Sequence, residues 1–414
     1  MPMTMGALAL FKPDHPVHPR RIAALLADRA RKLPRLHESP RSTWFPPGGV
    51  AWSRCRDFAA ADHVHTHCVR GRGREDRLIE LVTGIMARPL DPHRPLWEIH
   101  VVAGLPGARF GLLIKLHHAL TDGAGAAALV AGLLDDFAPD TVRSRPPRPA
   151  WRALTTPSGL AGLARQAVET LGVAGSVVGA ARPATALATF GATPGRRRLA
   201  TLRLNRDDIL RIRKIHGGTT NDVVLAVLAG ALRECLPDGR TVRALVPVNV
   251  RRDADGQDTG NHLSGYLCDL PVGEPDPVTR LRIVRARMDA RKAAGAARGA
   301  GAVPLLAGRV PGALHRAVGP LLRRSAPLLF DTVITNVPVP DIPLRLDGAE
   351  LDELYPIVPL AHGIAFNAAV STYRNTVHIA LQTAGGGGPD VAELAAATKT
   401  ALPALHLSTS DRKG

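Results

Sequence analysis

Cysteine and aromatic side chains are scarce in this sequence. Four of the 414 residues are cysteine, and aromatic residues make up 4% of the chain. The cysteines form no CxxC pair and no spacing typical of a secreted disulfide scaffold, so we expect free thiols in a reducing cytoplasm. A core with so few aromatic rings must be built from Leu, Val, Ala and Ile.

Long uninterrupted hydrophobic runs are also missing. The opening residues MPMTMGALALF are apolar, but no basic region or evident cleavage site accompanies them, so they favour a strand over a signal peptide. The Ala/Gly-rich stretch 158–180 contains Arg165 and Glu169, which makes it a poor membrane span. We therefore expect a soluble, cytoplasmic protein that touches lipid only from the surface.

Acidic residues are outnumbered. There are 53 Lys and Arg against 36 Asp and Glu, which gives a net charge of +17. Such a charge attracts nucleic acid, anionic lipid surfaces or phosphorylated cofactors, although an arginine-rich composition with scattered arginines gives the same value. No zinc-finger spacing, aromatic RNA-binding motif or dense basic helix is present, so nucleic acid is not an expected partner.

The order of the elements predicts an α/β (α+β) fold in two domains. The length exceeds one ordinary core, and 45% hydrophobic with 21% charged residues is typical of a globular protein. We assign residues 1–138 to the first domain, 139–198 to a linker and helical crossover that starts with PDTVRSRPPRP, and 199–414 to the second domain. A cleft between two domains is a usual place for a site.

Hydrophobic periodicity places the elements. Apolar residues at helical spacing predict helices over 17–33, 75–88, 221–235 and 277–298, and another that starts at Gly123. Strand-like runs occur at 97–102, 110–117, 199–204, 242–248, 262–270, 331–337, 365–373 and 376–382.

The sharpest local feature is the heptapeptide HHALTDG, residues 117–123. The run 110–116 alternates, so His118 should continue its apolar face while His117 points the other way. An imidazole at a strand end, beside an Asp and a Gly-permitted turn, suits a general base because the pKa of histidine lies near neutrality. A paired core histidine before an ordinary Asp-Gly turn would give the same pattern. Asp122 would either orient the imidazole or hold the loop through an arginine.

Six further segments accompany HHxxxDG in order: RPLWE at 94–98, ND at 221–222, PVNVRR at 247–252, GNH at 260–262, TNVP at 335–338, and YP followed by HG within 355–363. Together these residues resemble the bacterial wax ester synthase/diacylglycerol acyltransferase family, over nearly the whole chain. That family is part of the coenzyme A-dependent acyltransferase superfamily, with chloramphenicol acetyltransferase and peptide-synthetase condensation domains.

The resemblance implies two chloramphenicol acetyltransferase-like domains with an active-site tunnel between them. It implies that His118 faces the tunnel as the base, and that His117 and Asp122 complete the catalytic set. The expected substrate-binding residues are Gly123, Asn221, Asp222 and His362. Asn221 is equally well explained as the N-cap of the apolar helix that follows it.

The resemblance also implies an O-acyltransferase. It would move a long acyl chain from acyl-CoA to diacylglycerol or a fatty alcohol, with no metal or other cofactor, and would contact an anionic membrane or lipid droplet peripherally. Two alternatives stay open: a tailoring or condensation-type enzyme that acts on a natural-product hydroxyl or amine, and a non-catalytic relative that binds an acyl or carrier-protein ligand. Relatives usually carry a further segment ahead of Met3, so we expect a version extended upstream to be more stable.

Three other features have simpler explanations. His63, His65 and His67 would share one strand face, but regularly spaced strand residues do not easily surround one ion, so no metal site is expected. The run Arg196–Arg198 is more typical of a solvated turn than of a cofactor phosphate site. Trp97 is expected in the core.

Overall fold

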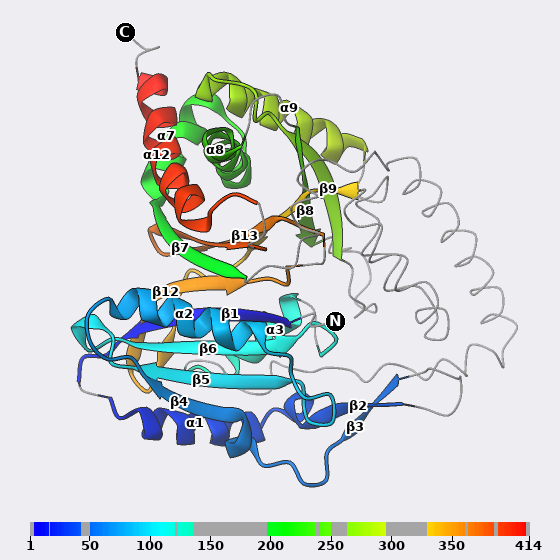
Figure 1. Ribbon diagram of the computed structural model, residues 1–414, viewed down its shortest axis with the longest axis vertical. Coiled ribbons are helices and arrows are strands. Elements are labelled where there is room, and N and C mark those ends of the chain that lie inside the picture. The colour runs from blue at the N-terminus through cyan, green and yellow to red at the C-terminus, as the bar shows by residue number, and fades with distance from the viewer. Residues whose placement is uncertain are drawn as a thin grey trace, which may run out of the picture.

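Two mixed β-sheets form two lobes that face each other (Figure 1). The computed structural model describes residues 4–15, 17–42, 50–120, 123–135, 197–236, 241–249, 263–294, 329–360, 363–384 and 388–410. Asp122 and His362 therefore lie outside the described residues. All four cysteines are free thiols.

The first sheet has the strand order β11-β12-β1-β6-β5-β4. Neighbouring strands are antiparallel except β4 and β5. Their bounds are β1 Thr4–Lys12, β4 Val64–Cys68, β5 Trp97–Ala103, β6 Phe110–His117, β11 Arg345–Leu346 and β12 Ala349–Ile357. A separate ribbon pairs β2 (Glu38–Ser42) with β3 (Val50–Arg54), and short 3-10 turns occupy η1 Pro34–His37, η2 Ala60–His63 and η3 Pro106–Ala108.

Helices bury both faces of the first sheet. On one face, α1 (Pro19–Arg31) and α3 (Gly123–Ala131) share a core with Leu112 and Ile114 of β6. On the other face, α2 (Arg74–Ala87) packs on Leu113. Strand β6 is therefore buried on both sides and ends at the histidine motif, which gives the motif a rigid support.

Strand β12 lies in the first sheet although it comes from the range 199–414. It pairs with β1, with Tyr355 opposite Leu8 and Pro356 opposite Ala7. Pro356 has no N–H to donate, but β11 borders β12 only at residues 349 and 350, so no ladder bond on that side is lost. The last third of the chain thus completes the sheet that the first third begins.

The second sheet has the strand order β7-β14-β13-β10-β8-β9. Its strands are β7 Arg198–Asn205, β8 Val242–Asn249, β9 Leu263–Leu270, β10 Thr332–Val337, β13 Phe366–Tyr373 and β14 Thr376–Thr383. The helices of its outer face are α7 Arg206–His216, α8 Thr220–Cys235, α9 Pro277–Ala294 and α12 Val391–Ser410. Helix α8 is buried at every position from 222 to 232, so it is the central element of this lobe's core.

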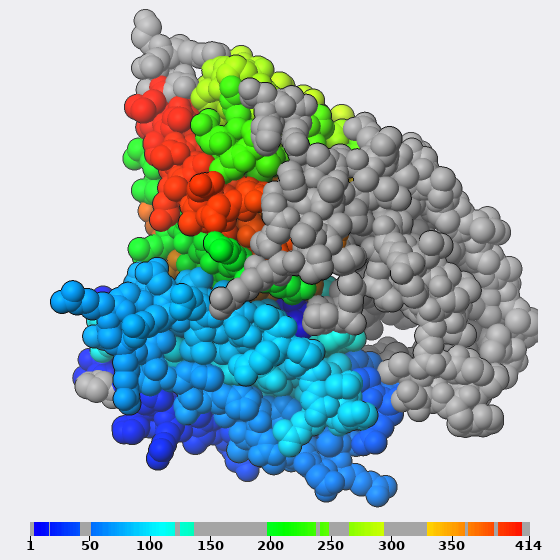
Figure 2. Space-filling view, viewed as in Figure 1, coloured from blue at the N-terminus to red at the C-terminus, as the bar shows by residue number. Residues whose placement is uncertain are grey.

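The two lobes meet along a seam between α2 and β12 on one side and β7, β13 and β14 on the other. Leu8 and Tyr355 of the first sheet share a core with Leu199 and Ala380 of the second. Figure 2 shows the two lobes in direct contact along this seam. Within the described parts of the chain, no helix is both long and apolar enough to cross a bilayer.

Candidate active site

The histidine motif stands at the carboxyl end of β6. His117 is the last residue of the strand; it lies opposite Thr4 of β1, and its N–H donates to the carbonyl of Leu96 at 3.0 Å. Residues 118–120 then form a turn, in which the N–H of Leu120 donates to the carbonyl of His117 at 2.8 Å. The strand therefore ends at His117, as expected, and His118 is the first residue of the turn.

The two histidines differ in their surroundings. The Nδ1 atom of His117 accepts a hydrogen bond from the N–H of Ala119 at 3.1 Å, which fixes the imidazole against the turn. His118 is half-buried at the start of the turn. His117 thus fixes the turn, and His118 is its first residue.

Arg35 of η1 anchors the same turn from the neighbouring segment. Its Nε donates to the carbonyl of Leu120 at 3.0 Å, and its guanidinium also pairs with Glu38 and lies 4.5 Å from the centre of the Trp52 ring. Sequence reasoning missed Arg35, because it lies 85 residues from Leu120 and no motif marks it.

Asn221 and Asp222 lie in the first turn of α8, in the other lobe. Asp222 is 1% exposed, and one carboxylate oxygen accepts hydrogen bonds from the N–H and the hydroxyl of Thr219 at 2.7 and 2.8 Å. The Thr219 hydroxyl in turn accepts from the N–H of Asp222 at 3.2 Å, which completes a capping box. The N-cap is therefore Thr219 and not Asn221, and the Asp222 contacts are those of a helix start.

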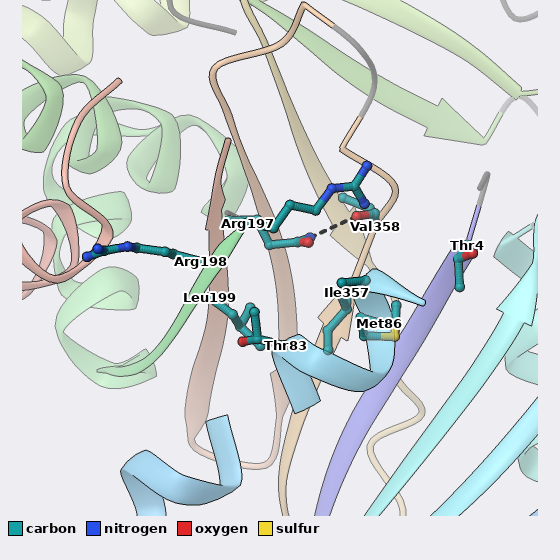
Figure 3. A pocket seen from close by; sticks show the side chains of 10 residues that line it. Thr4, Thr83, Met86, Arg197, Arg198, Leu199, Ile357 and Val358 are labelled. Carbon is teal, nitrogen blue, oxygen red and sulfur yellow. Dashed lines mark hydrogen bonds between the residues drawn. The ribbon is translucent and has the colours of Figure 1, made fainter. Parts of the chain in front are cut away.

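A small pocket of about 10 Å³ lies on the seam at the same end of the first sheet as the motif (Figure 3). Thr4, the register partner of His117, lines it together with Thr83 and Met86 of α2. From the second lobe come Arg197, Leu199 and Gln382.

Arg197 belongs to the wall of this pocket. It donates to the carbonyl of Leu360 at 3.2 Å, and burial lowers the pKa of its guanidinium from the ordinary value. Its neighbour Arg198 pairs with Asp390 at 3.1 Å. The solvated turn expected for this run is therefore wrong for Arg197, which is a half-buried cation on the seam.

A second cavity, of about 290 Å³, lies farther along the seam. Its apolar wall is formed by Leu8, Leu10, Leu78, Ile79 and Leu202, and its polar wall by Glu75, Thr201, Arg203, Glu353, Tyr355 and Lys399. Because Leu8 faces Leu113 and not His117 in the β1–β6 register, this cavity is remote from the histidine motif.

The three histidines near β4 do not share one face. His63 precedes the strand, stacks on Trp97 at 4.6 Å and bonds the Trp97 carbonyl at 2.9 Å through Nδ1. His65 and His67 lie beside His100 on the α2 side of the sheet. Alternation fails at His63 because β4 begins only at Val64. Trp97 is 1% exposed, so its expected place in the core is confirmed.

A half-buried histidine in the turn that follows a central strand, beside a seam between two mixed sheets, defines a two-lobed acyltransferase or condensation-domain architecture. Solved structures with this fold include the wax ester synthase/diacylglycerol acyltransferase of Marinobacter aquaeolei VT8, at a TM-score of 0.71 and 24% identity over 99% of this chain and 95% of that chain. The first condensation domain of the CDA synthetase matches with a TM-score of 0.63 and 17% identity, over 99% of this chain and 92% of that chain.

Sequence comparison is more specific. The wax ester synthase/diacylglycerol acyltransferase catalytic domain matches residues 1–224, and the C-terminal domain of the same family matches 259–406. Two Mycobacterium tuberculosis proteins named probable diacylglycerol O-acyltransferases are similar: tgs1 is 30% identical over 99% of this chain and 93% of its own length, and tgs2 is 32% identical over 98% and 95%. The chain belongs to the wax ester synthase/diacylglycerol acyltransferase family and is an acyltransferase that uses an acyl donor and an acceptor.

Proposed function

We propose that this chain transfers a long acyl group from acyl-CoA to the hydroxyl of diacylglycerol or of a fatty alcohol, with His118 as the general base. The observation that carries the proposal is the placement of His118, half-buried in a turn fixed by His117 and Arg35. The names of the mycobacterial relatives support diacylglycerol as an acceptor, and the family name supports an alcohol.

The proposed chemistry needs one base and two bound substrates. His118 takes the proton of the acceptor hydroxyl while the oxygen attacks the thioester carbonyl. The C–S bond then breaks, and the proton passes from His118 to the departing thiolate, so ester and free CoA are the products. Because both substrates meet on the protein, proximity lowers the barrier and no covalent acyl-enzyme is required. The proposal includes no metal or redox cofactor.

His118→Ala tests the base directly. Loss of a general base costs about 10²–10⁴-fold in rate, so thiol release from acyl-CoA should fall by that factor while the melting temperature stays near native. The matched control is His93→Ala, which removes an exposed histidine outside the motif. Near-native turnover in a folded His118→Ala variant would refute the assignment. A panel with diacylglycerol, hexadecanol and an alkyl amine distinguishes lipid esterification from tailoring of an amine.

We also propose reversible contact with an anionic membrane or droplet surface through α7. Among the described residues, four large hydrophobic side chains are exposed, and two of them, Leu210 and Ile215, lie on this helix at 37% and 41% exposure. Arg211 and Lys214 are exposed next to them. Aliphatic and basic side chains on one helix face are typical of an interfacial helix, and the net charge of +17 favours an anionic surface.

Charge reversal tests this surface. Arg211→Glu/Lys214→Glu should abolish most sedimentation with vesicles that contain phosphatidylglycerol at low salt. Arg31→Glu/Lys32→Glu changes the net charge equally at the exposed end of α1 and should bind nearly as well as the native chain. Native binding should also fall as salt rises toward ~1 M, where the Debye length is about 3 Å. Equal loss in both pairs, or binding insensitive to salt, would contradict a specific role of α7.

A further inference from the structure

A partly buried ion pair, in which the Glu98 side chain is 27% exposed, lies next to the histidine end of β6. Lys115 is 1% exposed, and its Nζ donates to Oε2 of Glu98 at 2.9 Å. The two residues lie directly opposite each other in the β5–β6 register, on the face that α2 covers. Lys115 is thus the charged member of a strand whose other residues from 110 to 116 are apolar.

Two histidines extend the pair toward the sheet edge. His100 Nε2 lies 3.2 Å from the same Glu98 oxygen, and His67 Nε2 lies 3.1 Å from His100 Nδ1. Because a carboxylate only accepts, His100 donates through Nε2, and its Nδ1 shares a second hydrogen bond with Nε2 of His67. Lys115, Glu98, His100 and His67 therefore form one chain of hydrogen bonds across three strands, called here the Lys115–His67 network.

Other charged groups face this network. His65 stacks on His100 at 4.9 Å. Burial, His100 and Arg88 lower the pKa of His67, which keeps its ring neutral near neutral pH. Burial alone would raise the pKa of Glu98, but the hydrogen bonds from His100 and Lys115 outweigh it and lower the pKa to about 2. The carboxylate is therefore ionised wherever the protein is folded at ordinary pH.

Stability alone does not explain a charged pair at this position. Removing a lysine and a glutamate from water costs more than their attraction usually returns, and a pair of apolar side chains of similar volume is often as stable or more so. The next residue of the same face, Leu113, is apolar and fully buried. A charged pair at 98 and 115 thus serves a purpose other than filling the core.

The position of the pair suggests that purpose. Trp97 and Leu116 form the residue pair that follows Glu98 and Lys115 along β5 and β6. One residue farther, the N–H of His117 donates to the carbonyl of Leu96. On the opposite face Trp97 Nε1 donates to the carbonyl of Leu36 at 2.7 Å. At the end of the β5–β6 pair, a polar contact of Lys115 thus holds β6 to β5 on one face, and a polar contact of Trp97 holds β5 to η1 on the other. Lys115 and His117 are alternate residues of one strand, about 7 Å apart along it.

We propose that the Lys115–His67 network positions the His117–His118 turn for acyl transfer, by holding the end of β6 against β5. This inference rests on the proposed function. Lys115 and Glu98 are positioning residues and do not touch the substrate. The network keeps the histidines in the geometry that the reacting oxygen needs, because displacements near 1 Å at such a site cost up to about 10²-fold in rate.

The test removes both charges together. In Glu98→Leu/Lys115→Met two apolar side chains replace the pair, so the melting temperature should equal or exceed the native value. Thiol release should nevertheless show kcat reduced at least about tenfold, with KM for acyl-CoA within about twofold. Lys115→Arg keeps the pair and should retain most of kcat. Leu113→Met, a change of similar volume on the same strand face, is the matched control and should behave as native.

Each outcome of these experiments supports or overturns the positioning role of the Lys115–His67 network. Native kcat in a stable double variant would overturn the inference, because the pair would then be ordinary core. Should the double variant fail to fold, Glu98→Asp keeps the charge and withdraws the carboxylate by one methylene; a loss in kcat at unchanged KM supports the network, and native kcat overturns it. A native chain inactive with every acceptor refutes the proposed function instead. An active native chain, inactive His118→Ala and fully active Glu98→Leu/Lys115→Met together refute the network alone.

Discussion

Arg35 controls the turn of the histidine motif through one planar group. The guanidinium bonds the Leu120 carbonyl, pairs with Glu38 and covers the Trp52 ring. A lysine keeps the charge but lacks the planar guanidinium, which can bond the carbonyl, pair with the carboxylate and stack on the ring at the same time. Arg35 is therefore a residue outside the motif that holds this turn in place.

Arg35→Lys should lower kcat about tenfold with a small change in KM, since losing a hydrogen bond to a charged donor costs roughly 1.5–3 kcal/mol. The measurement is initial-rate thiol release at saturating and limiting acyl-CoA. Arg41→Lys, at an exposed position of β2, is the control and should be unchanged. Equal rates in the two variants would show that the turn does not need Arg35.

The lowered pKa of Glu98 predicts that the unfolding free energy depends on pH. Its pKa falls from 4.5 in the unfolded chain to about 2 in the folded protein, so its ionised form contributes stability above pH 4.5 that is lost as the pH falls toward 2. The full contribution is about 3 kcal/mol. The difference in unfolding free energy between the native chain and Glu98→Gln should be constant above about pH 5 and shrink below it. A difference that does not change between pH 5 and 3 would contradict this interpretation.

At the scale of elements, the start of α8 carries a pair of residues that the sequence predicts to bind substrate and that the fold uses to begin a helix. The family pair Asn221–Asp222 lies in the first turn, and Asp222 belongs to the capping box with Thr219. Its remaining carboxylate oxygen, Oδ1, is buried and has no hydrogen-bond partner among the residues that the structure describes. The hydrogen bonds of the other oxygen, Oδ2, are those of a helix start.

Thr219→Ala should lower the unfolding free energy by about 1 kcal/mol, because it removes the side chain that caps the helix. Below the melting transition kcat should stay near native. Thr400→Ala, an exposed hydroxyl within α12, is the matched control and should cost less. The measurement is chemical denaturation of both variants. A large loss of kcat in fully folded Thr219→Ala would give the start of α8 a direct part in the reaction.

The limits of helices and strands with a strong hydrophobic periodicity could be predicted from the sequence to within about one residue. Helices α2 and α8 and strands β5 and β6 begin or end within one residue of the expected limits. The placement of β12 could not be predicted, because its pairing with β1 joins positions more than 330 residues apart and Pro356 argues against a central strand. The anchoring of the histidine turn by Arg35 could not be predicted either, because no motif links Arg35 to Leu120.

At the scale of the whole molecule, Glu353 joins three parts of the chain. It accepts from Arg109 of the first lobe and from Arg203 of β7, both at 3.0 Å, and also from the Tyr355 hydroxyl. Its side chain is 7% exposed, although that of Arg203 is 60% exposed. Because β12 carries Glu353 within the first sheet, this cluster fastens the two lobes at the seam.

Glu353→Gln should lower the unfolding free energy by about 2 kcal/mol, a value reduced from that of a fully buried pair because Arg203 is largely in solvent. Glu350→Gln is the matched control: it removes a solvent-exposed carboxylate of the same strand, paired with Arg345 and Arg374, and should lower the unfolding free energy by less than Glu353→Gln does. Both are measured by urea unfolding. Equal costs would show that the cluster is no stronger than a surface pair.

The central claim is that the chain esterifies a hydroxyl lipid with the acyl group of acyl-CoA by means of His118. The most direct measurement follows free thiol and ester product together, with palmitoyl-CoA as donor and diacylglycerol or hexadecanol as acceptor, for the native chain and His118→Ala. We predict equal amounts of thiol and ester from the native chain and a rate about 10²–10⁴-fold lower for the variant. Thiol release without ester, or ester formed at a native rate by folded His118→Ala, would contradict the account.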